Sequence, residues 1–119
     1  MTETERRTAV PMSEPQKIYA NFAVGQVIHH RLFDYRGVIV DVDSQFQGTE
    51  EWYQQVAGTR PPRDKPWYRV LVHNSMGTTY VAERNLEADG SGEPVNHPHV
   101  SLYFTEFKDG IYCNWKMNN

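Results

Sequence analysis

The chain has 119 residues, in which 12 lysines and arginines stand against 15 aspartates and glutamates, for a formal net charge of −3. This length allows one domain with one modest hydrophobic core and excludes a second core. The acidic balance argues against a protein whose main task is to bind nucleic acid, because phosphates require a basic face. A local basic patch remains open.

Cysteine content and hydrophobic patterning exclude further classes. Cys113 is the only cysteine, so the chain can form neither an intrachain disulfide nor a cysteine-based zinc site. No apolar run reaches the roughly 18 residues of a membrane span, and no charged-then-apolar leader is present. We therefore expect a cytoplasmic protein without membrane association.

Polar sequence at both ends sets the expected domain boundaries. Residues 1–16 contain two prolines and no hydrophobic periodicity, which predicts a disordered tail. The folded domain is expected to span residues 17–116. Residues 117–119 are expected to fray.

Two apolar runs, Val24–Leu32 and Gly37–Val42, predict an antiparallel hairpin that begins a small β-barrel. Within the second run, Val38, Val40 and Val42 recur at every second position. This alternation is typical of a half-buried strand that points all three valines to one face.

A proline-rich insertion follows the hairpin. Thr49 is a suitable N-cap for a short helix over residues 49–56, and the acidic residues of its first turn suit the helix dipole. Trp52 and Val56 lie four positions apart, so they are expected to share the face that packs on the barrel. Residues 60–66 are rich in proline and are expected to form an exposed connector.

A second hairpin is predicted from Trp67–Val72 and Thr78–Ala82. Its turn is expected to place Gly77 in the left-handed conformation. Residues 88–93 are expected to form a flexible loop. The predicted fold class is therefore mainly β, an antiparallel barrel with a short inserted helix.

A C-terminal helix is predicted over residues 97–107. Apolar side chains recur there at helical spacing, and they are Val100, Tyr103, Phe104 and Phe107. A helix that packs this face against the barrel is the simplest interpretation.

The sequence supplies no clear catalytic or metal-binding group. His29 and His30 are adjacent on a strand, so their side chains point to opposite faces and cannot chelate one ion. Asp41 and Asp43 share a strand face, but they also end a strand, where aspartate favours turns. No nucleophile–base grouping, phosphate loop or cofactor motif is present. We therefore expect a non-enzymatic protein with no metal and no cofactor.

Basic side chains interleaved with aromatic ones suggest two contact surfaces, one at the first hairpin and one beside Trp67. Such patterns are typical of proteins that bind nucleic-acid backbones. Between Phe22 and Glu87, however, seven basic side chains face eight acidic ones, so a mixed, solvated surface is the alternative. The candidate contacts to DNA or a protein partner are His29, Arg31, Tyr35, Arg36, Arg60, Arg63 and Lys65.

Several short motifs fall in a recognisable order. The first hairpin carries Val24-Gly25-Gln26-Val27, His30, Tyr35-Arg36-Gly37-Val38-Ile39 and Asp43. The second carries Trp67-Tyr68-x-Val70 and Tyr80-Val81-Ala82-Glu83-x-Asn85-Leu86. Together they resemble the YccV-like domain, also called the HspQ or hemimethylated-DNA-binding domain. The segments Glu50-Glu51-Trp52 and His97-Pro98-x-Val100-x-x-Tyr103-Phe104-x-x-Phe107 look like the version found at the C-terminus of an F-box-only protein.

The resemblance implies a small SH3-like β-barrel without catalysis, for which two roles compete. In one, the domain binds hemimethylated double-stranded DNA and modulates replication initiation. In the other, an HspQ-type protein linked to heat shock acts as an adaptor or modulator of a Lon-type protease in protein quality control. Its partner is then the protease or a protease substrate. The acidic charge favours the adaptor. The oligomeric state stays open, with a homo-oligomer as one alternative.

Overall fold

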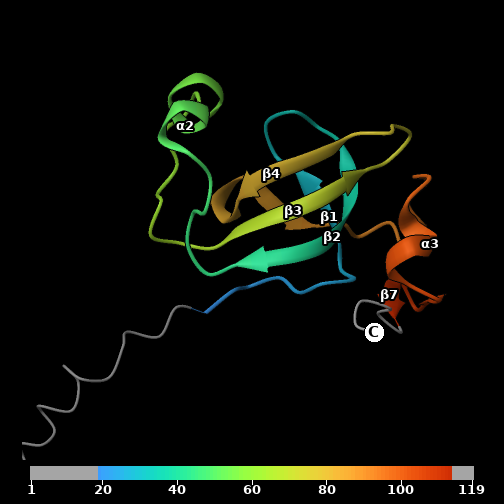
Figure 1. Cartoon of the computed structure of the whole chain (residues 1–119). Coiled ribbons are helices and arrows are strands. Elements are labelled where there is room, and N and C mark those ends of the chain that lie inside the picture. Colours follow the sequence, from blue (N-terminus) through green and yellow to red (C-terminus); the bar gives the residue numbers. More distant parts are fainter. Residues whose placement is uncertain (1–18, 114–119) are drawn as a thin grey trace, which may run out of the picture.

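The computed structural model describes residues 19–113, and its main feature is one antiparallel sheet of five strands (Figure 1). In spatial order the strands are β4, β3, β2, β1 and β5, so β4 and β5 form the two edges. Their bounds are Thr78–Ala82, Trp67–Val72, Arg36–Asp43, Val27–His30 and Leu86–Ala88, respectively. The prediction of a mainly β fold built on two hairpins is confirmed. The expected tail (1–16) and frayed end (117–119) lie outside the described residues.

The central strand β2 is buried on both faces, which differs from the half-buried strand expected. Val38, Ile39 and Val40 are each at most 3% exposed. A β-bulge lies between Ile39 and Asp41, and it leaves Val40 without a partner on β3. Because a bulge adds one residue to one strand, it reverses the side-chain alternation beyond it. Val42 consequently packs with Ile39 rather than with Val38 and Val40.

A C-terminal layer covers one face of the sheet. It contains the short helix α3 (Val100–Tyr103) and the hairpin of β6 (Glu106–Lys108) and β7 (Ile111–Cys113). Its inward side chains pack on Val27, Val38, Val40 and Leu71; they include Val95, Phe104 and Tyr112. The C-terminal helix is present but much shorter than the predicted 97–107. Phe104 is already extended and Phe107 belongs to β6.

The inserted helix α2 (Glu50–Val56) lies at the far end of the sheet from α3 (Figure 1). The Thr49 hydroxyl accepts a hydrogen bond from the Trp52 amide at 3.1 Å, which confirms the predicted N-cap. The expected docking face was wrong in part, because Val56 is 56% exposed. Tyr53 and Ala57 are buried in its place, on Trp67 and Ala82.

The turn between β3 and β4 also differs from expectation. Asn74, with φ of 60°, takes the left-handed conformation predicted for Gly77. Asparagine tolerates this region better than most residues. Ala88, expected in a flexible loop, pairs with Ile28 as part of β5. Within residues 19–113, no helix is both long and apolar enough to cross a lipid bilayer.

Candidate functional site

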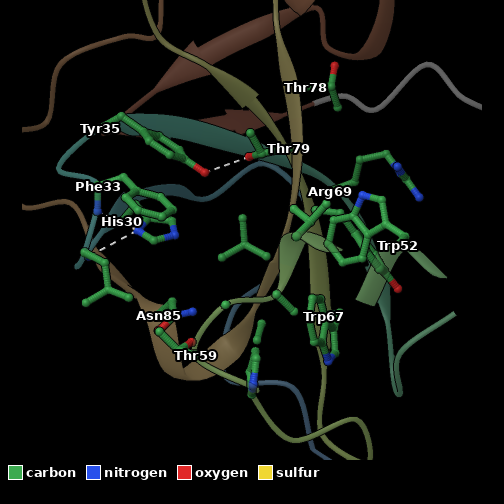
Figure 2. Close-up of a pocket in the computed structure, with 18 residues that line it drawn as sticks. His30, Phe33, Tyr35, Trp52, Thr59, Trp67, Arg69, Thr78, Thr79 and Asn85 are labelled. Atoms are coloured by element: carbon green, nitrogen blue, oxygen red, sulfur yellow. Dashed lines mark hydrogen bonds between the residues drawn. The ribbon is translucent and has the colours of Figure 1, made fainter. Parts of the chain in front are cut away.

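A groove of about 520 Å³ runs beside the edge strand β4. All five residues of β4 line it. Figure 2 shows His30, Phe33 and Tyr35 on one side and Trp52, Trp67 and Arg69 on the other. The groove therefore has a floor of strand edge and two walls that are largely aromatic.

One wall is an aromatic cluster that joins α2 to the sheet. Phe46 lies at the centre, with ring centroids 4.8 Å from Trp67, 5.9 Å from Trp52 and 5.9 Å from Tyr80. Trp67 is only 1% exposed, and its indole nitrogen donates to the Pro62 carbonyl at 3.0 Å. Phe46 and Trp67 meet edge to face, a geometry that stabilises aromatic pairs beyond simple burial. The α2 wall is thus held firmly to β3 and β4.

The other wall is the corner between β1 and β2. His30 is 3% exposed, and its Nδ1 accepts hydrogen bonds from the amides of Leu32 at 3.1 Å and Phe33 at 3.0 Å. Burial lowers the pKa of His30, and the neighbouring His29 lowers it further. Because Nδ1 accepts twice, the neutral ring carries its proton on Nε2. No group within residues 19–113 accepts from that Nε2–H.

Apolar side chains remain uncovered along both walls. Phe33 is 74% exposed and stacks on His30 with ring centroids 4.7 Å apart. Leu32 and Val56 are also more than half exposed, at 54% and 56%. Three exposed apolar residues around one concavity are characteristic of a binding surface rather than of random surface apolarity.

The groove contains one formal charge among its lining residues. Arg69 lies over the Tyr80 ring with its Cζ 4.9 Å from the ring centroid. It pairs with no carboxylate in the described part of the chain. Tyr80 itself donates to Asp43 at 2.5 Å, and burial together with this bond raises the pKa of Tyr80 to about 12. The ring therefore stays neutral at physiological pH.

Tyr35 is the only predicted contact residue that lines this groove. Its hydroxyl lies 2.7 Å from the Thr79 hydroxyl, which joins the β1–β2 corner to β4. Burial raises the pKa of Tyr35, although the Thr79 bond opposes the shift. The hydroxyl is therefore a neutral, partly satisfied group at the groove wall.

His29 and Arg31 lie at the other side of the corner. His29 contacts Asp34 through Nε2 at 2.7 Å and Glu87 through Nδ1 at 2.8 Å. The hydrogen bond to Asp34, followed by that to Glu87, raises the pKa of His29. Arg31 donates through Nε to the Leu86 carbonyl at 3.4 Å. Both side chains tie the corner to β5.

Arg36 anchors the segment after β5. Its guanidinium contacts Asp89 at 3.2 Å and donates to the carbonyls of Glu93 at 2.5 Å and Pro94 at 3.2 Å. The side chains of Arg36 and Asp89 are only 20% and 11% exposed. Burial raises the pKa of Asp89, but the Ser91 hydroxyl and Arg36 outweigh it and hold the pKa below its usual value. Arg36 therefore has a structural role.

The second predicted basic group lies around α2. Arg63 pairs with Glu50 at 2.5 Å and lies over the Tyr53 ring, with its Cζ 3.8 Å from the centroid. Arg60 donates to Gln54 at 3.1 Å. Lys65 lies outside the groove and forms no ion pair within residues 19–113. The structure thus does not gather the seven predicted residues into one surface.

The groove was missed by reasoning from sequence. Two features of the sequence could have indicated it. Leu32 and Phe33 are adjacent apolar residues at a corner where polar residues are usual, and a tryptophan lies in an isolated short helix. Which strand edge they flank depends on the sheet order, which no local pattern reveals. Among residues 19–113, no cluster of three or more histidine, cysteine, aspartate or glutamate side chains is arranged to hold a metal ion.

Residues 20–111 match the model of a known protein family. The matching family is described as "hemimethylated DNA-binding protein YccV like". The chain belongs to the YccV-like family. The resemblance expected from the two hairpins is confirmed, and it extends through the C-terminal layer. Members of this family are binding domains.

Proposed function

We propose that this YccV-like protein is a non-catalytic adaptor that holds a segment of a protein partner in the groove beside β4. The observation that carries the proposal is the groove itself, about 520 Å³ with aromatic walls and three exposed apolar side chains. Protein interfaces are enriched in such aromatic anchors. The partner class follows from the resemblance to HspQ, and it is a Lon-type protease or a substrate of that protease.

The electrostatics of the domain support a protein partner. Most of the predicted basic contacts are engaged by neighbouring groups, as with Arg36 on Asp89 and Arg63 on Glu50. A phosphate would have to displace these partners, whereas the groove walls need only lose water. Burial of one phenylalanine side chain contributes about 2 kcal/mol, so two or three anchors suffice for a regulated, reversible complex.

A degradation assay tests this function. Added in increasing amounts to a Lon-type protease and an unfolded model substrate, the protein should increase the initial rate of proteolysis. Phe33→Ser should abolish the increase, because Phe33 is exposed and can be replaced without opening the core. The matched control is Leu102→Ser, an exposed apolar residue on α3. An unchanged proteolysis rate over the whole titration would contradict the adaptor role.

Hemimethylated DNA is the second candidate partner, and the description of the family supports it. Lys65, which forms no ion pair within residues 19–113, and Arg60 are then the first expected phosphate contacts, because Arg63 and Arg36 would have to leave Glu50 and Asp89. Binding to a hemimethylated duplex should fall steeply with salt. Equal affinity for hemimethylated and unmethylated duplexes at about 150 mM salt, near physiological ionic strength, would exclude the DNA role.

A further inference from the structure

The edge strand β4 carries backbone groups that are unpaired along the groove. Just beyond the two ends of β4, the Val72 amide donates to the Gly77 carbonyl and the Glu83 amide donates to the Pro66 carbonyl. Every second residue between these two bonds also faces β3, and these residues are Thr79 and Val81. Hydrogen-bonded and non-bonded pairs alternate in an antiparallel ladder. The amides of Thr78, Tyr80 and Ala82 therefore point away from β3. They bond to no group in residues 19–113. Ala82 is 2% exposed and packs against α2, so the open part of the edge is at Thr78 and Tyr80.

The groove is centred on this unpaired edge. In Figure 2, Thr79 lies between the wall of His30, Phe33 and Tyr35 and the opposite wall of Trp52 and Trp67. Side chains of an added strand would alternate between these two walls, because successive residues of a strand point to opposite faces. Each wall offers an exposed apolar residue, Phe33 on one side and Val56 on the other.

From this arrangement we infer that the groove binds an extended peptide segment of the partner as a sixth strand, paired to β4. The segment has apolar side chains at alternate positions and an aspartate or glutamate beside Arg69. This inference rests on the proposed function and specifies its mode. Strand addition of this kind takes affinity from main-chain hydrogen bonds and specificity from alternate side-chain pockets.

Two polar groups specify the chemistry of the segment. The buried Nε2–H of His30 lies within the groove wall and lacks an acceptor among the described residues. A backbone or side-chain oxygen of the peptide satisfies it. Arg69 is the only charged lining residue, and it pairs with no carboxylate within residues 19–113. Charge complementarity therefore selects an acidic residue and disfavours a basic one.

The test uses the full chain and a fluorescent peptide of about eight residues, a common strand length, in which leucine and serine alternate and a glutamate stands at one end. Fluorescence anisotropy should show binding. N-methylation of single backbone nitrogens should weaken binding about tenfold at every second position and leave the intervening positions unchanged, as the loss of one buried hydrogen bond predicts. A glutamine in place of the glutamate should weaken binding to the parent protein and not to Arg69→Gln. Arg60→Gln serves as the matched charge control.

Amide hydrogen exchange separates strand pairing from docking of apolar side chains alone, which would not protect the amides of β4. In the free protein the Tyr80 amide should exchange rapidly and the Val81 amide slowly; saturating peptide should protect Tyr80. Binding without alternation and without protection of Tyr80 would overturn strand addition while leaving groove docking intact. Protection of Tyr80 in the free protein, together with a dimer by sedimentation, would assign the edge to a second copy and overturn the inference. Absence of peptide binding to a monomer, with proteolysis still increased, would also overturn it.

Discussion

Two surfaces of this YccV-like domain differ in how far their polar groups are already satisfied. The predicted basic side chains mostly have partners, such as Asp89 for Arg36 and Glu50 for Arg63. The groove beside β4 instead presents an unbonded His30 donor and unpaired edge amides. A group that is already paired must lose one partner before it gains another, so it adds little to binding. Charge type alone is therefore a poor guide to a binding site.

The largest effect is expected where a predicted DNA contact is a structural ion pair. Arg36→Ala leaves the Asp89 carboxylate, 11% exposed, without its guanidinium. Breaking a buried pair from one side costs about 3 kcal/mol of unfolding free energy. Urea denaturation measures this change. The control Lys65→Ala removes a cation that has no ion pair in residues 19–113, so it should leave the urea midpoint unchanged. An equally small effect of Arg36→Ala would show that Arg36 has no structural role and is available for contact with a partner.

A smaller effect is expected from Tyr80, whose side chain and backbone have separate tasks. Tyr80→Phe removes the hydrogen bonds of the hydroxyl to Asp43 and from Gln47. The loss should lower the unfolding free energy by about 1 kcal/mol. Peptide affinity should hold, because the inferred contact uses the Tyr80 amide. A tenfold loss of affinity in this variant, with the fold intact by circular dichroism, would mean that the hydroxyl network rather than the strand edge holds the ligand.

The smallest effect is a pH dependence that separates the two adjacent histidines. The pKa of His29 is raised above 6.5 by Asp34 and Glu87, so its stabilisation is complete below pH 6.5 and is lost as pH rises through the raised value. The pKa of His30 is lowered below 6.5 by burial, so its contribution is lost as pH falls from 6.5 through the lowered value. Stability attributable to this pair should peak near pH 6.5.

His29→Gln tests which histidine causes the loss of stability on each side of pH 6.5. Urea midpoints measured between pH 5 and 8 should lose only the decline on the alkaline side, and the acid-side decline should persist. The change should be below about 1 kcal/mol, because Asp34 and Glu87 are largely exposed and water screens the pair. If the variant instead lost the decline below pH 6.5, that decline would belong to His29.

The strands and the cap of α2 were predictable from sequence because they depend on local chemistry. Thr49 needs only its own helix to act as an N-cap, and alternation reveals β3 and β4. The bulge at Val40 was not predictable, because it arises from the pairing of β2 with β3 and the residue type at that position does not indicate it. The C-terminal helix was overestimated because apolar residues at helical spacing also suit a layer that wraps a sheet face.

The candidate site was largely missed for the same reason. Sequence reasoning placed contacts where cations occur, and of seven residues only Tyr35 lines the groove. Which cations meet a carboxylate is decided by long-range neighbours, as with Arg36 and Asp89, 53 positions apart. Phe33 could have been singled out as an aromatic residue in a polar corner and Trp52 as one in an isolated short helix. Their common location beside an unpaired strand edge is a property of the sheet order.

A nitrogen-15 NMR titration distinguishes strand addition at β4 from DNA binding. One sample receives the alternating leucine–serine peptide, and a second receives a hemimethylated duplex at about 150 mM salt, near physiological ionic strength. Strand addition at β4 predicts that the peptide shifts the amide signals of Thr78 and Tyr80 and the Nε2–H of His30, while the duplex shifts none of them. Shifts confined to Arg60, Arg63 and Lys65 on addition of the duplex, with no response to the peptide, would contradict it.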